Sequence, residues 1–344
     1  MRHSYQSNCR FQIYKALFGQ ENPGLSRCTV PGGSLEFSPR EPHARVAVAS
    51  EGKSMKIGMI GVGLMGHGIA RNVMRRGGFA LGYFDHPGNQ PTDELDGLGA
   101  TAFDSLSDLA AASDVIILCV TGSPQVEGIL TGEGGVIAGL KPGAVVVDCS
   151  TSLPASTLKM AEAVKAAGGD FVDAPMTRTA QFAHEGKLNL LVGGDADTVE
   201  KVSPVLAAFT EEVKHVGAVS AGHRLKLLHN YVSVGFMSLL AEAAAQSADA
   251  GIDPQSFVDV LAGGGGASVA LDRLSPFITS GNREALPFAI SNALKDFDYY
   301  RQMSAQAGAQ VEIADGVYRA LSQVVEKGAG DAYVPELVQH FRKG

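Results

Sequence analysis

The chain has little of what several classes of protein require. It contains only four cysteines in 344 residues, and none belongs to a C-x-x-C pair or a zinc-like cluster, so we expect reduced thiols and no metal site. There are 28 basic residues against 36 acidic ones, and the net charge of −8 argues against a nucleic-acid-binding surface, which needs clustered positive charge. The longest apolar runs, such as residues 115–120, are strand-sized rather than membrane-spanning. The composition therefore predicts a cytoplasmic protein with neither a nucleic-acid nor a membrane partner.

The first 54 residues differ in composition from the rest. They are polar, rich in Ser, Arg, Gly and Pro, and show no sustained periodicity, whereas a folded pattern begins at Met55. Either Met55 is the natural start and residues 1–54 are a disordered or mis-assigned extension, or the segment is a transit peptide. Transit peptides are poor in acidic residues, and this segment carries four glutamates. We therefore favour the first interpretation.

From Met55 onward, short β-rich runs alternate with helical patterns. Strands are expected at 56–60, 79–84, 114–120, 144–149, 170–174 and 189–193. Helical patterns such as 65–76 and 154–167 lie between most of them. This alternation predicts a parallel sheet that is covered by helices on both faces.

The strand patterns stop after Gly217. Residues 221–250 then read as one long helix rich in Leu and Ala, and further helical patterns run to the end of the chain. We predict an α/β protein with a doubly wound parallel-sheet domain over residues 55–217. The long helix joins it to an all-α domain over residues 218–344, which we expect to bind substrate and to form the oligomer contact.

A G-x-G-x-x-G turn follows the first expected strand. Its residues are Gly61, Gly63, Leu64, Met65 and Gly66. The first glycine permits a tight turn, the second lets the backbone approach a pyrophosphate at the helix N-terminus, and the third allows close helix–strand packing. Because the turn lies between a buried strand and a helix, it predicts a Rossmann-type, dinucleotide-binding domain.

Asp85 stands about 20 residues after this turn, at the end of the second expected strand. Its carboxylate can accept both ribose hydroxyls of the adenosine and would repel a 2′-phosphate. The next two residues, His86 and Pro87, supply no arginine. The sequence therefore favours NAD over NADP as the cofactor.

Three further segments make the pattern specific. Residues 173–179 read Asp-Ala-Pro-Met-Thr-Arg-Thr, residues 222–230 read Gly-His-Arg-Leu-Lys-Leu-Leu-His-Asn, and Lys295-Asp296 lies in a helical pattern. Together with the glycine turn, in this order, they resemble the β-hydroxyacid dehydrogenase family. That family includes 3-hydroxyisobutyrate dehydrogenase, tartronate semialdehyde reductase and sulfolactaldehyde reductase, and the resemblance covers residues 55–341. It implies hydride transfer between NAD and a small anionic β-hydroxy acid or its semialdehyde, by a homodimer or homotetramer.

The resemblance gives the proton-transfer role to Lys226. Lys226 and Asn230 are four residues apart in the expected long helix, so they share one face. An ammonium group can donate a proton to a carbonyl oxygen as hydride arrives at the carbon. In the reverse direction the lysine must be neutral, so its pKa must fall below the usual value of about 10.4. Asn230 is expected to orient Lys226 or the substrate.

Other contacts also follow from the resemblance. The expected substrate contacts are Thr177, Arg178, Thr179, Lys226, Asn230 and Lys295. Val120 and Thr121 are expected near the adenosine ribose or pyrophosphate, Thr151 near the nicotinamide, and Lys295 near both cofactor and substrate. Arg178 departs from the family, which usually has Ser-Gly-Gly at residues 177–179. Its guanidinium either meets the substrate anion, as in sulfolactaldehyde reductases, or points away and shapes the pocket.

Several rival interpretations are open at this point. 6-Phosphogluconate dehydrogenase shares the cofactor turn but has a much longer helical domain. Imine reductases, and non-catalytic dinucleotide-binding modules of chromatin-associated relatives, lack the lysine that this chain has at Lys226. The sequence thus favours an oxidoreductase most like 3-hydroxyisobutyrate dehydrogenase, with sulfolactaldehyde or tartronate semialdehyde reductase as alternatives.

Overall fold

A computed structural model describes residues 27–30, 33–36, 55–86 and 88–343. The chain divides into two compact units, residues 1–52 and residues 53–344. In the first unit, β1 (Arg27–Val30) and β2 (Gly33–Glu36) pair as an antiparallel hairpin, which the sequence analysis did not predict. The rest of the expectation for residues 1–54 lies outside the described residues.

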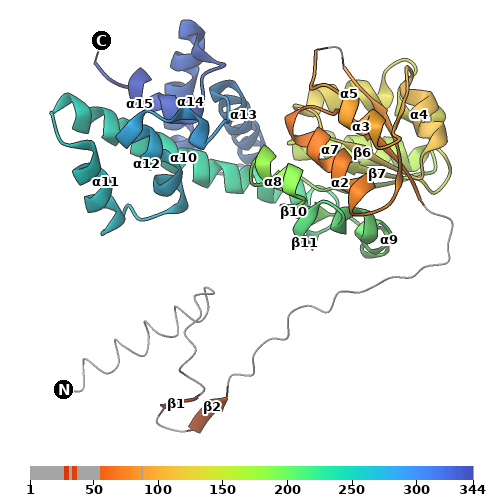
Figure 1. Ribbon diagram of the computed structural model, residues 1–344, viewed down its shortest axis with the longest axis horizontal. Coiled ribbons are helices and arrows are strands. Elements are labelled where there is room, and N and C mark those ends of the chain that lie inside the picture. The colour runs from red at the N-terminus through yellow and green to blue at the C-terminus, as the bar shows by residue number, and fades with distance from the viewer. Residues whose placement is uncertain (1–26, 31–32, 37–54, 87, 344) are drawn as a thin grey trace. The chain divides into compact units, whose positions relative to one another are not determined.

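The second unit begins with a large, mainly parallel sheet (Figure 1). Its strands are β3 (Lys56–Ile60), β4 (Ala80–Phe84), β5 (Thr101–Ala102), β6 (Val115–Leu118), β7 (Val145–Asp148), β8 (Asp170–Asp173), β9 (Met176–Thr177), β10 (Leu188–Gly193) and β11 (Thr210–Gly217). Their spatial order is β11-β10-β8-β7-β6-β3-β4-β5, with β9 paired to β10. The order reverses direction at β3, and such a switch point in a doubly wound sheet is where ligands bind, at the carboxyl ends of the strands.

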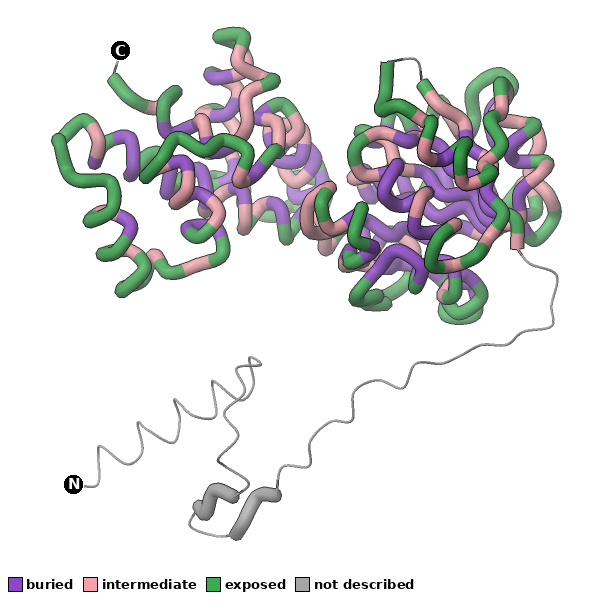
Figure 2. Tube along the Cα trace, in the orientation of Figure 1, coloured by how far each residue is buried: buried purple, intermediate pink, exposed green. Residues whose placement is uncertain are grey.

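Helices cover both faces of this sheet. They are α2 (Leu64–Arg75), α3 (Asp93–Gly97), α4 (Leu106–Ala112), α5 (Ser123–Thr131), α6 (Val136–Gly139), α7 (Pro154–Ala166), α8 (Ala180–Glu185) and α9 (Ala196–Ala207). In β6, Val115 and Ile117 pack into one core with α2, α3 and α9, while Ile116 and Leu118 pack into another with α4, α5 and α7. Figure 2 shows the strands as a buried layer beneath the helices. A strand buried on both faces must be apolar throughout, which explains the unbroken hydrophobic runs in the sequence.

Beyond β11 the described chain is helical. Its elements are α10 (Ala221–Asp249), α11 (Pro254–Ala262), α12 (Val269–Ser280), η1 (Arg283–Ala285), α13 (Ile290–Gln306), α14 (Glu312–Val324), η2 (Val325–Ala329), η3 (Val334–Glu336) and α15 (Leu337–His340). They share a core that includes Ala241 of α10, Leu274 of α12, Phe297 of α13 and Leu321 of α14. None of the helices over the described ranges is long and apolar enough to cross a membrane.

The α/β architecture predicted from the sequence is confirmed, with one correction to the sheet. β10 is antiparallel to β8, although a wholly parallel sheet was expected. After β8 the short helix α8 packs against α2, where the amide of Asn72 donates to the Ala183 carbonyl oxygen at 2.9 Å. Because α8 does not carry the chain back across the sheet, the chain re-enters at the edge where β8 left it, and β10 runs antiparallel to β8. The two-residue strands β5 and β9, and the largely exposed edge strand β11, were not predicted.

Candidate active site

The turn after β3 is shaped by crowding at two of its glycines. Gly61 has a φ of 90°, and a Cβ there would lie 2.3 Å from the Cys119 carbonyl oxygen. A Cβ on Gly66 would lie 1.9 Å from the Gly61 carbonyl oxygen. At Gly63, by contrast, the nearest atom is Asn89 Oδ1 at 3.7 Å. The first and third glycines are therefore required by the fold, whereas the second leaves the backbone open to a ligand.

The beginning of α2 fits an anionic group. Its N-cap, Gly63, offers no side chain to the free backbone N–H groups, and the first turn contains no acidic residue. Unpaired amides and the positive end of a helix form a site for phosphate. Gly63, Leu64 and Met65 would therefore supply backbone N–H groups to the pyrophosphate of a dinucleotide.

Asp85 lies beside this turn. The Gly61 N–H donates to the carbonyl oxygen of Phe84, the last residue of β4, at 3.4 Å. One carboxylate oxygen of Asp85 accepts a hydrogen bond from the Asn89 side chain at 2.9 Å. This acidic side chain is thus held at the carboxyl end of β4, where the second strand of a nucleotide-binding unit presents its ribose-binding residue.

The loops after β6 and β7 are tied to each other. The Val120 N–H donates to the Ser150 hydroxyl at 3.0 Å. A Cβ on Gly122 would lie 3.5 Å from the carbonyl oxygen of Thr151. The residues expected to contact the cofactor from these two loops therefore lie together at the carboxyl edge of the sheet.

Helix α13 adds a lysine and a tyrosine to this edge. Lys295 Nζ donates to the Thr121 carbonyl oxygen at 2.7 Å and lies 5.1 Å from the centre of the Tyr299 ring. The Tyr299 hydroxyl accepts a hydrogen bond from the Ser123 N–H at 3.2 Å. Residues from the sheet and from the later helices thus meet here within one compact unit.

Lys226 lies in the second turn of α10 and is partly buried. Within the part of the chain that the structure describes, its ammonium makes no hydrogen bond or ion pair. Burial lowers its pKa to about 8; Asp296 opposes this shift, and the positive charges of Lys295 and Arg273 add to it. A lysine with this pKa can both give and take a proton near neutral pH.

Asn230, one turn beyond Lys226, is fixed at both ends of its amide. Its Nδ2 donates to Asp296 Oδ2 at 2.6 Å, and its Oδ1 lies 2.9 Å from His229 Nδ1. The other oxygen of Asp296 lies 3.0 Å from Lys295 Nζ. Asp296 therefore connects the two helices that carry the candidate lysines.

The segment expected to bind the substrate anion begins in β9. Thr177 pairs with Asn189 of β10, and Thr179 precedes α8 as its N-cap without a side-chain cap. Between them, Arg178 has a φ of 77°, in the left-handed region that residues other than glycine seldom adopt. The backbone thus takes a glycine-like conformation at Arg178, where the family usually has glycine.

The Arg178 side chain is engaged within the protein. Its guanidinium pairs with the Glu211 carboxylate and donates to the Lys187 carbonyl oxygen at 2.7 Å. It also lies 4.9 Å from the centre of the Phe182 ring. These contacts tie the loop after β9 to the beginnings of β10 and β11.

Two family models match the chain. Residues 56–217 match the NAD-binding domain of 6-phosphogluconate dehydrogenase, and residues 220–341 match the NAD-binding region of NADP-dependent 3-hydroxyisobutyrate dehydrogenase. The 2-(hydroxymethyl)glutarate dehydrogenase of Eubacterium barkeri is 32% identical over 277 residues, which cover 80% of this chain and 90% of that one. The chain belongs to the β-hydroxyacid dehydrogenase family.

Two further relatives agree with this assignment. A 3-sulfolactaldehyde reductase of Escherichia coli is 36% identical over 188 residues, 55% of this chain and 62% of the other. The solved structure of 3-hydroxyisobutyrate dehydrogenase of Mycobacterium tuberculosis with L-serine has a TM-score of 0.75 at 23% identity, covering 84% of this chain and all of that one, and supports the shared fold. This β-hydroxyacid dehydrogenase is thus an oxidoreductase that uses NAD or NADP and acts on hydroxyl groups.

A buried polar cluster that was not predicted from the sequence underlies the candidate site of this β-hydroxyacid dehydrogenase. It contains Asp148 at the end of β7, Asp173 at the end of β8, and His223 in the first turn of α10, all fully buried. Burial raises the pKa of Asp173, and the charge of His223 opposes that shift. A carboxylate that directly follows a run of valines was a signal for the first of these residues, but nothing in the sequence paired it with the histidine.

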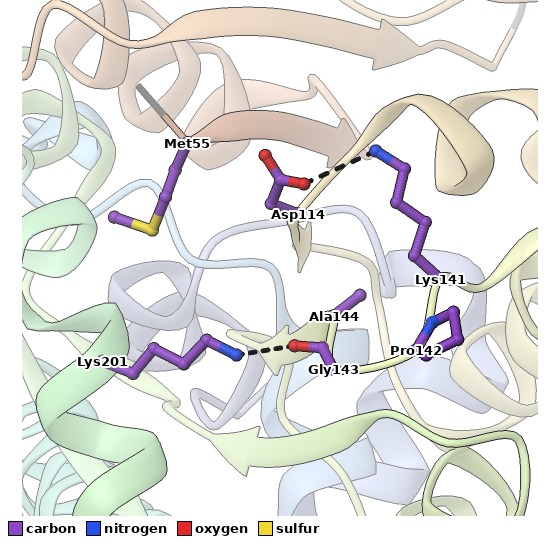
Figure 3. A pocket seen from close by; sticks show the side chains of 7 residues that line it. All are labelled: Met55, Asp114, Lys141, Pro142, Gly143, Ala144 and Lys201. Carbon is purple, nitrogen blue, oxygen red and sulfur yellow. Dashed lines mark hydrogen bonds and ion pairs between the residues drawn. The ribbon is translucent and has the colours of Figure 1, made fainter. Parts of the chain in front are cut away.

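A separate hollow lies at the opposite edge of the sheet (Figure 3). Its volume is about 220 Å³, and it lies beside the beginnings of β6 and β7. Lys141 approaches Asp114 at 3.5 Å, and Lys201 donates to the Gly143 carbonyl oxygen at 2.6 Å. Since the candidate residues lie at the carboxyl ends of the strands, this hollow is not part of the site.

Proposed function

We propose that the protein is an NAD-dependent dehydrogenase that acts on a small β-hydroxy acid or its semialdehyde, with Lys226 as the proton-transfer residue. The observation that carries the proposal is the environment of the Lys226 ammonium and the pKa that this environment produces. It is partly buried without an ion-pair partner among the described residues, and burial lowers its pKa to about 8. An ordinary surface lysine would remain protonated and could not serve as a base near neutral pH.

Lys226 moves a proton at the substrate oxygen. A nicotinamide, when bound, supplies or accepts the hydride at the neighbouring carbon. In the reducing direction the Lys226 ammonium donates a proton to the carbonyl oxygen, and in the oxidising direction the neutral amine takes the hydroxyl proton. Asn230 lies one turn along the same helix and is fixed by Asp296, so its amide can hold the substrate or the lysine in a set orientation.

Asp85 supports NAD as the cofactor. Its carboxylate lies at the end of β4 beside the glycine turn, where it can accept ribose hydroxyls. A 2′-phosphate at that place would meet the negative charge of Asp85, which forms no ion pair with a lysine or an arginine over the described residues. This argument favours NAD within a family that uses either cofactor.

The substrate that we propose is a small anion. The hydroxyl and backbone groups of Thr177 in β9 and of Thr179 at the start of α8 are the groups that the sequence resemblance assigns to the substrate anion, and Lys295 would approach it from α13. The contacts of Arg178 with Glu211 and Lys187 favour a role in shaping this segment over direct contact with a sulfonate. The homodimer or homotetramer implied by the sequence resemblance stays a prediction.

A substrate panel tests the proposal. The full chain is assayed by NADH absorbance with 3-hydroxyisobutyrate and 2-(hydroxymethyl)glutarate in the oxidising direction, and with tartronate semialdehyde and sulfolactaldehyde in the reducing direction. We expect kcat/KM above about 10⁴ M⁻¹s⁻¹ for at least one compound, and little turnover of a 2-hydroxy acid of similar size. Preference for the 2-hydroxy acid, or inactivity with all four compounds, would contradict the proposed substrate class.

A further inference from the structure

The start of α10, the helix that carries Lys226, is capped from another part of the fold. Its N-cap, Ser220, has a φ of 78° and makes no side-chain cap hydrogen bond with the described residues. The Ala221 N–H donates to the Ala218 carbonyl oxygen at 3.0 Å. The N–H groups of Ser220 and His223 lie in buried residues and need acceptors from elsewhere, since a buried N–H without a partner is costly.

Asp173, at the end of β8, supplies both acceptors. Its Oδ1 accepts the Ser220 N–H at 2.7 Å, and its Oδ2 accepts the His223 N–H at 2.8 Å. In an ordinary capping box, these two N–H groups bond to two side chains of the helix's own first turn. Here one carboxylate from a strand takes both bonds, and its charge suits the positive end of the helix. Burial raises the pKa of Asp173, and the two N–H donors oppose that rise.

Two glycines leave room for this carboxylate. A Cβ on Gly193 would lie 2.6 Å from Asp173 Oδ1, and a Cβ on Gly222 would lie 2.8 Å from Asp173 Oδ2. Gly193 is the last residue of β10 and pairs with Asp173 itself, whereas Gly222 lies in the first turn of α10. The cap is therefore built into the packing of β8, β10 and α10 against one another.

The cap joins two segments that the proposed reaction needs side by side. Asp173 begins the segment that continues into Thr177 and Thr179, the groups assigned to the substrate anion. Lys226 lies three residues beyond His223, less than one helical turn from the capped N–H. We propose that Asp173 is the N-terminal cap of α10 and thereby fixes the position of Lys226 relative to the substrate-binding segment. It is a positioning residue, and its effect on turnover rests on the proposed function, whereas the cap itself does not.

Hydrogen exchange of the full chain, resolved to single amides, tests the cap without any assay of activity. Asp173→Asn keeps the size of the side chain, but its NH₂ group cannot accept, so one of the two N–H groups loses its partner. We expect the amides of Ser220 and His223 to exchange about tenfold faster in this variant, the effect of losing a helix cap. Amides in the middle of α10 should exchange as in the parent.

The parent alone supplies a second comparison. Its Ser220 and His223 amides should exchange more slowly than the first amides of α2, where Gly63 offers no side-chain cap. Exchange in the parent that is as fast as at the start of α2 would overturn the cap. Unchanged exchange of both amides in Asp173→Asn would overturn it as well.

The positioning role is tested by comparing two caps of the same chemistry. Asp195, which is exposed, caps α9 by accepting the N–H groups of Asp197 and Thr198 at 3.1 and 3.3 Å. Asp173→Asn should lower kcat about ten- to a hundredfold, the size of effect that a small misplacement of a reacting group produces. NADH affinity should stay within about twofold, since the glycine turn is untouched. The matched control, Asp195→Asn, loses its cap too but should keep the kcat of the parent.

Two kinetic results would overturn the positioning role. One is a parent-like kcat in Asp173→Asn, and the other is an equal loss of kcat and NADH affinity, which would indicate general damage. Asp173→Ser, which keeps one acceptor oxygen, supplies the same comparison if the asparagine variant is insoluble. If neither variant folds, Asp173 is a requirement of folding and the positioning role is overturned. If Lys226→Ala proves fully active while exchange at Ser220 and His223 still depends on Asp173, the proposed function fails and the cap stands.

Discussion

Among single residues, Asp85 is the one on which the proposed preference for NAD rests. Replacing it with alanine removes the ribose acceptor and the charge that opposes a 2′-phosphate. A charged hydrogen bond contributes about 1.5–3 kcal/mol, so kcat/KM for NAD should fall about ten- to a hundredfold while that for NADP changes little. Steady-state kinetics with both cofactors measures this, with Asp104→Ala, an exposed carboxylate elsewhere in the same domain, as the control. A parent enzyme that is more efficient with NADP would show that the argument from Asp85 is wrong.

Arg178 decides whether the pocket has a dedicated anion-binding arginine. Arg178→Gly suits the left-handed backbone there and removes the guanidinium. Because that guanidinium is paired with Glu211, we expect KM for every acid in the panel to change by less than about threefold. The largely solvent-screened ion pair contributes only about 0–1 kcal/mol to folding, so thermal stability should change little.

The alternative for Arg178 has a distinct signature. If the guanidinium turns away from Glu211 to hold a substrate anion, KM for the true substrate rises by about one to two decades in Arg178→Gly. Glu211→Gln would then lower KM, since it releases the arginine from its competitor. This pair of results would support direct contact between the Arg178 guanidinium and the substrate anion.

At the scale of elements, the turn between β3 and α2 contains one glycine that the fold requires, Gly66, and one that only the bound cofactor is expected to require, Gly63. A methyl group on Gly66 would lie 1.9 Å from the Gly61 carbonyl oxygen, so Gly66→Ala should destabilise the fold by about 1–3 kcal/mol. A methyl group on Gly63 meets nothing closer than 3.7 Å. Gly63→Ala should therefore melt as the parent does but bind NADH more weakly, because the methyl group blocks the approach of the pyrophosphate.

Thermal denaturation and NADH fluorescence titration of the two glycine variants check this prediction. The variants are each other's controls, since they differ only in position within one turn. Parent-like NADH affinity in Gly63→Ala would mean that the cofactor does not approach the backbone at this glycine. Equal destabilisation of both would mean that the turn is packed differently from the contacts described for Gly61 and Gly66.

The elements differ in how far the sequence could predict them. β6 and β7 were readable because a strand buried on both faces is apolar at every position. β11 reads Thr-Glu-Glu-Val-Lys-His-Val-Gly and lies mostly exposed, so it has no hydrophobic pattern to detect. The antiparallel direction of β10 depends on α8 packing against α2, a contact between segments more than 100 residues apart. Local patterns cannot encode such long-range packing.

The candidate site shows the same division. Lys226 and Asn230 could be named because their spacing on one helix and the family resemblance point to the same chemistry. His223 lies three residues earlier in the same motif, yet its partners Thr157 and Ser150 are 66 and 73 residues away. These contacts exist only because the fold brings the end of β7 and the beginnings of α7 and α10 together.

At the scale of the whole molecule, the candidate site combines residues from the sheet with residues from the later helices. Thr121 and Thr151 come from loops at the carboxyl edge of the sheet, Lys226 from α10 and Lys295 from α13. The glycine turn and the loops after β6 and β7 suit a nucleotide, and α10 supplies the Lys226 ammonium proposed to transfer the proton. Under the proposed mechanism the reaction requires both parts of the chain, and its dependence on pH should report the titration of Lys226.

The pH dependence of turnover in both directions, for the parent and for Lys226→Ala, tests this account most directly. With a pKa of about 8, oxidation needs the neutral amine, so its rate should rise as pH increases through about 8. Reduction needs the ammonium, so its rate should fall over the same range. Lys226→Ala should lower kcat about 10²- to 10⁴-fold, abolish both pH dependences and leave NADH affinity nearly intact, whereas the control Lys201→Ala should match the parent. A Lys226→Ala enzyme with parent-like turnover and an unchanged pH profile would contradict the account.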